Sequence, residues 1–230
     1  MSYLTKICGI TNVDDALMVS KAGADYLGVL LNVVRSPRSV DQATAKEIVS
    51  VSNLPVIILT FNHDPDQVLA DIKTLQPAGV QLAGNENEDY IIQLKKKITC
   101  ELWKSIHVSS SDVTSINSDE LIKTIQSYHT LGVDKIILDS AVLREGTMYQ
   151  GGTGQCFDWS LAKTVKEQLP DVCLFLAGGI NPDNISDALL QVSPDGIDLS
   201  SGVEAVVGRK NPELVNLLMT NIKNLEASLQ

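Results

Sequence analysis

The fold class is decided by two neighbouring stretches, Leu174-Phe-Leu-Ala-Gly-Gly-Ile-Asn-Pro182 and Gly196-Ile-Asp-Leu-Ser-Ser-Gly-Val-Glu204. Each is an apolar run that stops at glycine or serine and then opens into a segment of helical character. Glycines let backbone amides approach a ligand closely, and a helix N-terminus adds positive potential. Two such turns in consecutive strand–helix units predict a phosphate cradle, which in a (β/α)8 barrel lies after strands seven and eight.

The rest of the chain repeats this alternation of strand and helix. Residues 26–31 form a continuous apolar run, which is typical of a parallel strand buried on both faces. Asn12 precedes two acidic residues, as expected for a helix N-cap. We expect strands at 3–8, 26–31, 55–61, 79–82, 101–108, 135–139, 173–176 and 197–199, and helices at 13–22, 41–52, 65–76, 88–97, 119–130, 160–169, 182–190 and 212–225.

Eight strand–helix units predict one (β/α)8 (TIM) barrel domain over residues 1–230. Doubly wound sheets share the same alternation, so the periodicity alone does not decide whether the sheet closes. The count of eight favours the barrel, and no linker or low-complexity tract divides the chain.

The overall charge limits the partners. The formal net charge is −10, and a nucleic-acid partner is not expected because such binding needs a basic face. A phosphorylated small molecule remains compatible, since a cradle of backbone amides needs no net positive charge. Helix faces show no continuous apolar stripe for a partner subunit, so we expect a monomer while the oligomeric state stays open.

Nothing in the chain predicts a metal site, a disulfide framework or a membrane segment. The first six residues contain no signal-peptide core, and no apolar run could span a bilayer. We therefore expect a cytoplasmic protein without metal. No CxxC pair and no ligand spacing is found among the cysteines and histidines, Cys8, Cys100, Cys156, Cys173, His63, His107 and His129.

Catalytic groups of a barrel sit at the carboxyl ends of its strands. The residues expected at those ends are Cys8, Asn32, Phe61, Asn62, Ala83, Val108, Asp139, Gly178, Gly179, Ser200 and Ser201. Only Cys8 and Asp139 are obvious proton-transfer groups. A thiol and a carboxyl group facing each other across the barrel mouth can serve as base and acid.

Seven motifs, in order along essentially the whole chain, carry a resemblance to a known family. They are Lys6-Ile-Cys-Gly-Ile-Thr11, Ser36-Pro-Arg38, Val80-Gln-Leu82, Leu138-Asp-Ser140, Gly151-Gly-Thr-Gly154 with Phe157-Asp-Trp159, Ala177-Gly-Gly-Ile-Asn-Pro182 and Asp198-Leu-Ser-Ser-Gly-Val-Glu204. The chain resembles the phosphoribosylanthranilate isomerases, which perform an Amadori rearrangement in tryptophan biosynthesis.

The resemblance implies a role for each site residue. Asp139 is the general acid that opens the furanose ring, and Cys8 is the general base that removes the C2′ proton. Arg38 holds the anthranilate carboxylate. No metal or cofactor is implied, because the substrate amine supplies the electron sink. The phosphate is held by Gly178, Gly179, Ser200, Ser201 and Gly202.

Each role has a structural alternative. Cys8 could be a small buried hydrophobe, and Asp139 could cap its loop. Arg38 could be a solvated surface charge, a place for which Arg35 is the stronger candidate. To act as an acid near neutral pH, Asp139 needs a raised pKa, which desolvation would provide.

Strand alternation turns Lys6 the same way as Cys8, one layer deeper in the barrel. Asp198, on the neighbouring eighth strand, points inward if Ser200 does. We therefore expect a buried Lys6–Asp198 pair, since an unpaired buried ammonium is costly. The alternative is a Lys6 that reaches solvent at the bottom of the barrel.

The sequence departs from the family in four places, two of which are the segments at residues 31–35, where the family is richer in aromatic residues, and 59–62. Ala83-Gly84 stands where the family usually has His-Gly, and the loop at 141–150, after Asp139, is longer than usual and suited to a lid. Two further functions therefore stay open. The chain could be a divergent barrel isomerase acting on another phosphorylated aminosugar, or a catalytically silent barrel that binds a phosphorylated ligand.

Overall fold

A computed structural model describes residues 2–109, 118–144, 147–150 and 159–229 of the chain. Eight parallel strands of the described part form a closed ring. Around the ring, each strand hydrogen-bonds to the next in the order β1, β10, β9, β7, β6, β5, β4, β2, and β2 pairs back with β1. The ring strands are β1 (Leu4–Ile7), β2 (Tyr26–Leu31), β4 (Val56–Thr60), β5 (Gly79–Leu82), β6 (Glu101–Ser109), β7 (Lys135–Arg144), β9 (Leu174–Ala177) and β10 (Gly196–Leu199).

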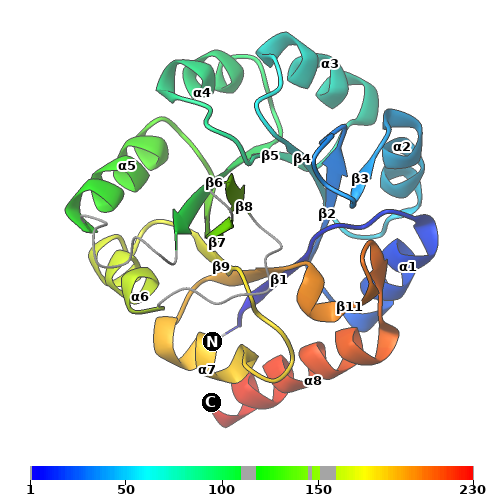
Figure 1. The fold of residues 1–230 in the computed structure, drawn as a ribbon, viewed down its shortest axis with the longest axis vertical. Helices are drawn as coiled ribbons and strands as arrows, with labels where there is room; N and C mark the ends of the chain where they lie inside the picture. Colours follow the sequence, from blue (N-terminus) through cyan, green and yellow to red (C-terminus); the bar gives the residue numbers. More distant parts are fainter. Residues whose placement is uncertain (1, 110–117, 145–146, 151–158, 230) are drawn as a thin grey trace.

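The seam between β1 and its two neighbours shows that the sheet is a barrel rather than an open sheet. Lys6 lies opposite Asp198 on β10 and opposite Tyr26 on β2, both in parallel register. Figure 1 shows the strands at the centre and the helices surrounding them. The predicted (β/α)8 barrel is therefore confirmed.

The helices begin and end at residues that local chemistry favours. Asn12 accepts a hydrogen bond from the Asp15 amide at 2.9 Å at the start of α1, and Gly23 ends that helix with φ of +94°. Pro65 and Pro212 occupy first-turn positions. The helices are α1 (Val13–Ala22), α2 (Gln42–Val51), α3 (Pro65–Leu75), α4 (Glu88–Lys95), α5 (Ser118–Thr130), α6 (Trp159–Gln168), α7 (Ile185–Val192) and α8 (Pro212–Ser228).

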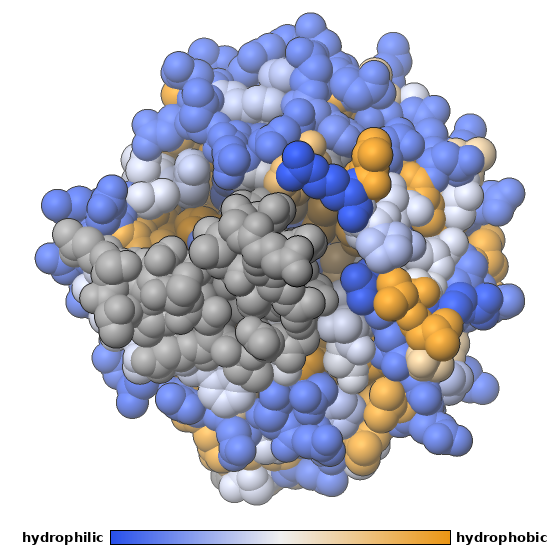
Figure 2. Space-filling view, viewed as in Figure 1, coloured by the Kyte–Doolittle hydropathy of each residue, from blue (hydrophilic) through white to orange (hydrophobic). Residues whose placement is uncertain are grey.

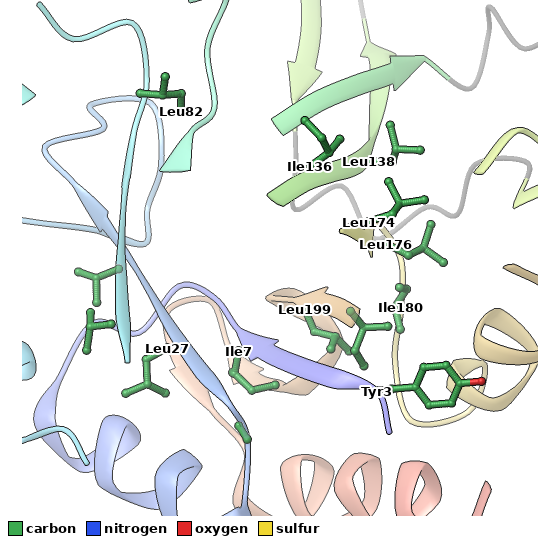
Figure 3. Packing of buried hydrophobic residues seen from close by; sticks show 14 of the residues in the cluster. Tyr3, Ile7, Leu27, Leu82, Ile136, Leu138, Leu174, Leu176, Ile180 and Leu199 are labelled. Atoms are coloured by element: carbon green, nitrogen blue, oxygen red, sulfur yellow. The ribbon is translucent and has the colours of Figure 1, made fainter. Parts of the chain in front are cut away.

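Apolar side chains form two layers. Outward-facing residues such as Ile7, Leu27 and Leu199 pack between the strands and the helices (Figure 3). Inside the ring, a second cluster that includes Trp103 and Phe175 fills the barrel. The aromatic rings of these two residues meet with centroids 5.0 Å apart. The inner layer fills the lower part of the barrel, and a cavity lies above it, toward the carboxyl ends of the strands.

Several short elements are absent from the sequence prediction. β3 (Ser39–Val40) extends the sheet beside β2, and η1 (Ser201–Val203) follows β10. β11 (Glu204–Val206) and β12 (Arg209–Lys210) form a hairpin before α8. These pairings join residues whose apolar pattern is too short to show a period.

The sequence predicts a long loop at residues 141–150, and this prediction is wrong. β7 continues through Arg144 and pairs antiparallel with β8 (Thr147–Gln150). The helix expected at 182–190 begins only at Ile185, because Pro182 and its neighbours form the turn before it. The GGTG motif at 151–154, together with Cys156 and Phe157, lies outside the described residues. Over the described chain, no helix combines the length and the apolar character needed to cross a membrane.

Candidate active site

A cavity of about 700 Å³ opens at the carboxyl ends of the strands. Figure 2, in the same view as Figure 1, shows a hollow near the centre of this face with hydrophobic residues visible inside it and hydrophilic residues along part of its rim. Most of the predicted site residues line the cavity, namely Cys8, Arg38, Asp139, Gly178, Gly179, Ser200 and Ser201. Gly202 is not among the lining residues. The structure thus brings the thiol and the carboxyl group to one opening.

Cys8 directly follows β1, and its amide donates to the carbonyl of Leu199 at 2.7 Å. The thiol is buried and packs over Gly28 of β2, where a methyl group in place of the glycine hydrogen would lie only 2.7 Å from Sγ. Burial raises the pKa of the Cys8 thiol, and Asp198 adds to the rise, while the Lys6 and Lys210 ammonium groups oppose it. Burial is the largest of these effects, and the two lysines limit the rise in the pKa of Cys8.

The Lys6–Asp198 pair that alternation predicts is confirmed. Lys6 Nζ donates to Asp198 Oδ2 at 2.8 Å, and the lysine is fully buried. Burial lowers the pKa of Lys6, but the Asp198 carboxylate and Cys8 outweigh this, so the pKa is raised overall. Lys6 is a permanent positive charge beneath the thiol.

Asp139 lies on β7 directly opposite His107 of β6. His107 Nδ1 is 3.8 Å from Asp139 Oδ2, and both residues line the cavity. The other ring nitrogen, Nε2, lies 2.9 Å from the carbonyl oxygen of Ala83. Burial lowers the pKa of His107 to about 4, and Lys104 adds to this effect. An uncharged imidazole therefore stands beside the carboxyl group.

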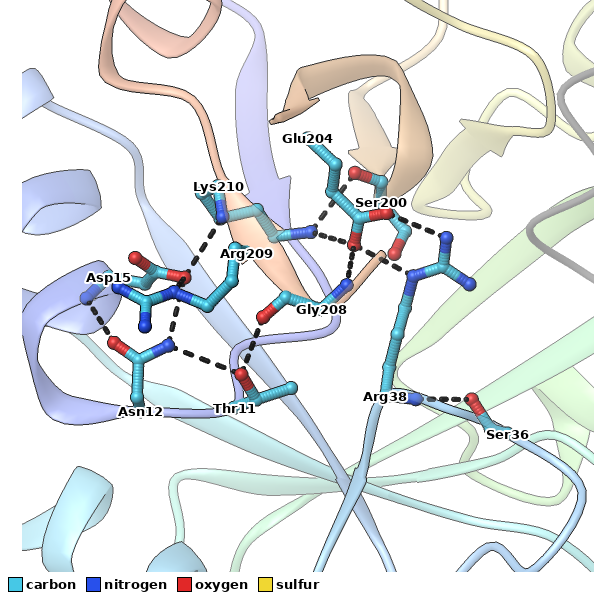
Figure 4. A network of polar contacts seen from close by, with 10 residues as sticks. All are labelled: Thr11, Asn12, Asp15, Ser36, Arg38, Ser200, Glu204, Gly208, Arg209 and Lys210. Atoms are coloured by element: carbon cyan, nitrogen blue, oxygen red, sulfur yellow. Dashed lines mark hydrogen bonds and ion pairs between the residues drawn. The ribbon is translucent and has the colours of Figure 1, made fainter. Parts of the chain in front are cut away.

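Arg38 reaches the opposite side of the cavity and is bound by a glutamate (Figure 4). Its Nε and Nη2 atoms donate to the two carboxylate oxygens of Glu204, each at 2.7 Å. Lys210 donates to Glu204 Oε1 at 3.1 Å and to the Ser200 carbonyl at 3.0 Å. Arg38 is therefore not a solvated surface charge. Two cations share one carboxylate at this edge of the site.

The two glycine turns after β9 and β10 lie against each other. Gly178 and Gly179 both have positive φ, +85° and +68°, which disfavours a side chain at either position. A methyl group on Gly202 would lie 1.9 Å from the carbonyl oxygen of Ile180. Gly202 therefore lets the second turn pack on the backbone of the first.

Replacing Gly202 by alanine is expected to force the two turns apart. We expect a loss of about 1–3 kcal/mol in the free energy of unfolding, the usual cost of overpacking, together with a higher inhibition constant for inorganic phosphate. Denaturant unfolding and phosphate inhibition of turnover measure the two effects. A Gly202→Ala variant with unchanged stability and unchanged phosphate affinity would contradict the packing described above.

The wall opposite the glycine turns is apolar. Leu59, Ala83 and Cys8 form a buried cluster, and Leu30 and Phe61 pack on it. Below, Gln81 donates to Ser105 Oγ at 2.9 Å. The cavity thus has an apolar side suited to a flat ring and a backbone-lined side suited to an anion. Within the described residues, no group of three or more His, Cys, Asp or Glu side chains is placed to hold a metal ion.

Three polar residues of the site are not found by the sequence prediction. Glu204 and Lys210 come together with Arg38 only through the β11–β12 hairpin and the tertiary fold. The sequence prediction names Val108 at the end of its strand, but Val108 packs in the outer core, and His107 is the neighbouring residue that lines the cavity. Alternation places Trp103, Ser105 and His107 on one face of β6, and the structure shows that this face is the inner one.

The fold and the cavity define a (β/α)8-barrel enzyme site with a thiol, a carboxyl group and two glycine turns at one mouth. Comparison with known proteins narrows this class. The family described as N-(5'phosphoribosyl)anthranilate (PRA) isomerase matches residues 5–221. The chain therefore belongs to the phosphoribosylanthranilate isomerase family, the isomerases of tryptophan biosynthesis that carry out an Amadori rearrangement.

Individual relatives agree. The N-(5'-phosphoribosyl)anthranilate isomerase of Acaryochloris marina is 34% identical over 229 residues, which is 96% of this chain and 98% of that protein. The tryptophan biosynthesis protein TrpCF of Haemophilus influenzae is 35% identical over 219 residues, 94% of this chain, but the match spans only 42% of that longer protein. A solved phosphoribosyl anthranilate isomerase in complex with reduced 1-(o-carboxyphenylamino)-1-deoxyribulose 5-phosphate has a TM-score of 0.76 at 26% identity, covering 96% of this chain and 99% of its own.

Proposed function

We propose that this chain converts N-(5-phosphoribosyl)anthranilate to the carboxyphenylamino-deoxyribulose phosphate, with Asp139 as general acid and Cys8 as general base. The observation that carries the proposal is that both groups line one cavity, between an apolar wall and a wall of glycine turns. This substrate has a flat aromatic ring at one end and a phosphate at the other. The cavity offers a matching surface for each end.

The proposed reaction moves two protons. Asp139 donates a proton to the furanose ring oxygen, the C1′–O bond breaks, and the nitrogen lone pair forms a protonated Schiff base. Cys8 then removes the C2′ proton, and the electron pair of that C–H bond forms the enolamine. The enolamine tautomerises to the aminoketone product. The substrate nitrogen donates its lone pair in the ring opening, and the protonated Schiff base formed in that step is the electron sink for removal of the C2′ proton.

The charges around Cys8 support its role as the base. The rate depends on the fraction of thiolate, because the thiolate is the proton acceptor. Burial keeps the pKa of Cys8 above its usual value, and Lys6 and Lys210 limit the rise. A thiol in this role must remain reduced, and we therefore propose a cytoplasmic location.

We propose that the backbone amides of the two turns hold the phosphate, at Gly178, Gly179, Ser201 and Gly202, with the Ser200 hydroxyl beside them. Ser200 Oγ is buried and has no hydrogen-bond partner among the described residues, so it is available to an anion. Arg38 would receive the anthranilate carboxylate. The guanidinium plane is fixed by Glu204, and the edge that carries Nη1 takes no part in that pair.

The proposal is tested by the loss of substrate fluorescence with synthesised phosphoribosylanthranilate. We expect the wild type to turn over this substrate and Asp139→Asn to lose about 10²–10⁴-fold in kcat/KM, the usual contribution of a general acid. The matched control is Asp134→Asn, an exposed aspartate whose side chain pairs with Lys95, for which we expect wild-type turnover. Tight binding of a phosphorylated ligand without turnover would instead indicate another aminosugar substrate or a silent binding protein.

A further inference from the structure

The imidazole of His107 has a fixed tautomer in this structure. Its Nε2 atom lies 2.9 Å from the carbonyl oxygen of Ala83. A carbonyl oxygen only accepts hydrogen bonds, so Nε2 carries the ring proton. In a neutral ring the lone pair is then on Nδ1. His107 therefore presents an acceptor, and not a donor, on its other side.

That acceptor faces the carboxyl group of Asp139. The two residues are register partners on adjacent parallel strands, and Nδ1 lies 3.8 Å from Oδ2. Nδ1 is buried and has no hydrogen-bond partner in the part of the chain that the structure describes. A buried polar atom without a partner costs free energy, which a contact roughly 1 Å shorter would recover. Contacts of this kind often tighten when substrate binds.

Burial keeps His107 neutral, and the charged groups around it act in both directions: Lys104 lowers its pKa and Glu86 raises it. On its own strand, Lys104 donates to the Gly84 carbonyl at 2.7 Å and to Glu86 at 2.9 Å. Glu86 comes from the loop after β5, and Asp139 is the facing group on β7. Desolvation dominates, so the pKa of His107 falls to about 4. Above that pH the ring carries no positive charge that could stabilise a carboxylate.

We infer that His107 is a positioning residue for Asp139, whose protonated carboxyl group donates to Nδ1 and is thereby kept in the proton-bearing form that a general acid needs. A carboxylate oxygen would face the Nδ1 lone pair, an unfavourable contact, whereas a carboxylic acid forms a hydrogen bond there. The inference rests on the proposed function for the step in which Asp139 gives up its proton. It assigns to β6 a group that acts on the acid without touching substrate.

Two isosteric substitutions distinguish the role of Nδ1 from the role of Nε2. His107→Gln places an amide NH2 where Nε2 donates to Ala83 but leaves no acceptor near Asp139. His107→Asn places its amide near Nδ1, where its oxygen can accept. We expect the limb of kcat/KM that reports Asp139 to move to lower pH by about one unit in the glutamine variant and to stay in place in the asparagine variant. His129→Gln, an exposed histidine on α5, is the control with no expected change.

The direction in which the pH profile of His107→Gln shifts tests whether His107 acts as a neutral acceptor. If His107 were a cation paired with Asp139, the limb would move to higher pH in His107→Gln. If His107 served packing alone, both variants would lose stability together and the limb would not move. Either result overturns the inference. Thermal unfolding of both variants shows whether they fold equally well.

A second measurement does not depend on turnover. The carboxylic-acid carbonyl band that is lost in Asp139→Asn can be followed against pH by infrared difference spectroscopy. We expect this band to disappear at lower pH in His107→Gln than in the wild type. A shifted band without turnover of phosphoribosylanthranilate would leave this inference standing and refute the proposed function. Turnover of phosphoribosylanthranilate with an unshifted band would support the proposed function and refute this inference.

Discussion

Cys8→Ala is expected to lose about 10²–10⁴-fold in kcat/KM while its free energy of unfolding falls by only about 1 kcal/mol. The thiol is the proposed acceptor of the C2′ proton, and alanine removes the acceptor without removing the space beside Gly28. A barrel of this size should then lose only about 2–4 °C in Tm. The fluorescence assay and a thermal melt of the same preparation measure both quantities.

Cys173→Ala is the matched control for this prediction. Cys173 is another free, partly buried cysteine, but it packs on the apolar cluster of Trp103 and Phe175 inside the barrel, away from the cavity lining. We expect a similar small loss of stability and wild-type turnover. If Cys8→Ala mainly unfolded the protein, or kept wild-type turnover, Cys8 would be a packing residue and not the base.

Lys6→Met is expected to have the largest effect on stability. It removes one partner of a fully buried pair and leaves the Asp198 carboxylate uncompensated. Breaking such a pair typically costs about 3–5 kcal/mol. Denaturant unfolding measures this cost. The double variant Lys6→Met with Asp198→Asn removes both charges and should recover much of the loss.

The same substitution should also change the pH dependence of turnover. Lys6 lowers the pKa of Cys8, so its removal raises that pKa and reduces the thiolate at any given pH. The limb of kcat/KM that reports Cys8 should therefore move to higher pH. In the double variant the limb should remain above that of the wild type, because Lys6 affects the Cys8 pKa more strongly than Asp198 does. A kcat/KM profile with neither limb moved in both variants would exclude Cys8 as the titrating base.

The elements that are predictable from sequence are those governed by local pattern. The run at residues 26–31 coincides with β2, and the cap at Asn12 starts α1 as expected. The Lys6–Asp198 pair follows from alternation within a strand and from adjacency of the first and eighth strands. Both rules require only that the fold is a barrel and that the direction of one side chain in each strand is known. The motifs provide this information.

The features of the site that the sequence does not predict depend on contacts between residues far apart in the chain. Both faces of β6 carry apolar and polar residues, so pattern alone does not show that Trp103, and hence His107, faces inward. Arg38 and Glu204 are 166 residues apart, and their contact requires the two loops to fold against each other. The roles proposed for Cys8, Asp139 and the glycine turns remain predictions of chemistry, which the experiments above address.

The bidentate contact between Arg38 and Glu204 has a consequence for affinity. A free arginine side chain loses about 1.5–2 kcal/mol of rotamer entropy when it is immobilised. Here that loss occurs when the protein folds, because Glu204 already fixes the guanidinium plane. A carboxylate ligand that binds to the folded protein contacts a guanidinium group whose orientation is already fixed. Its binding free energy is therefore not reduced by the cost of ordering the Arg38 side chain.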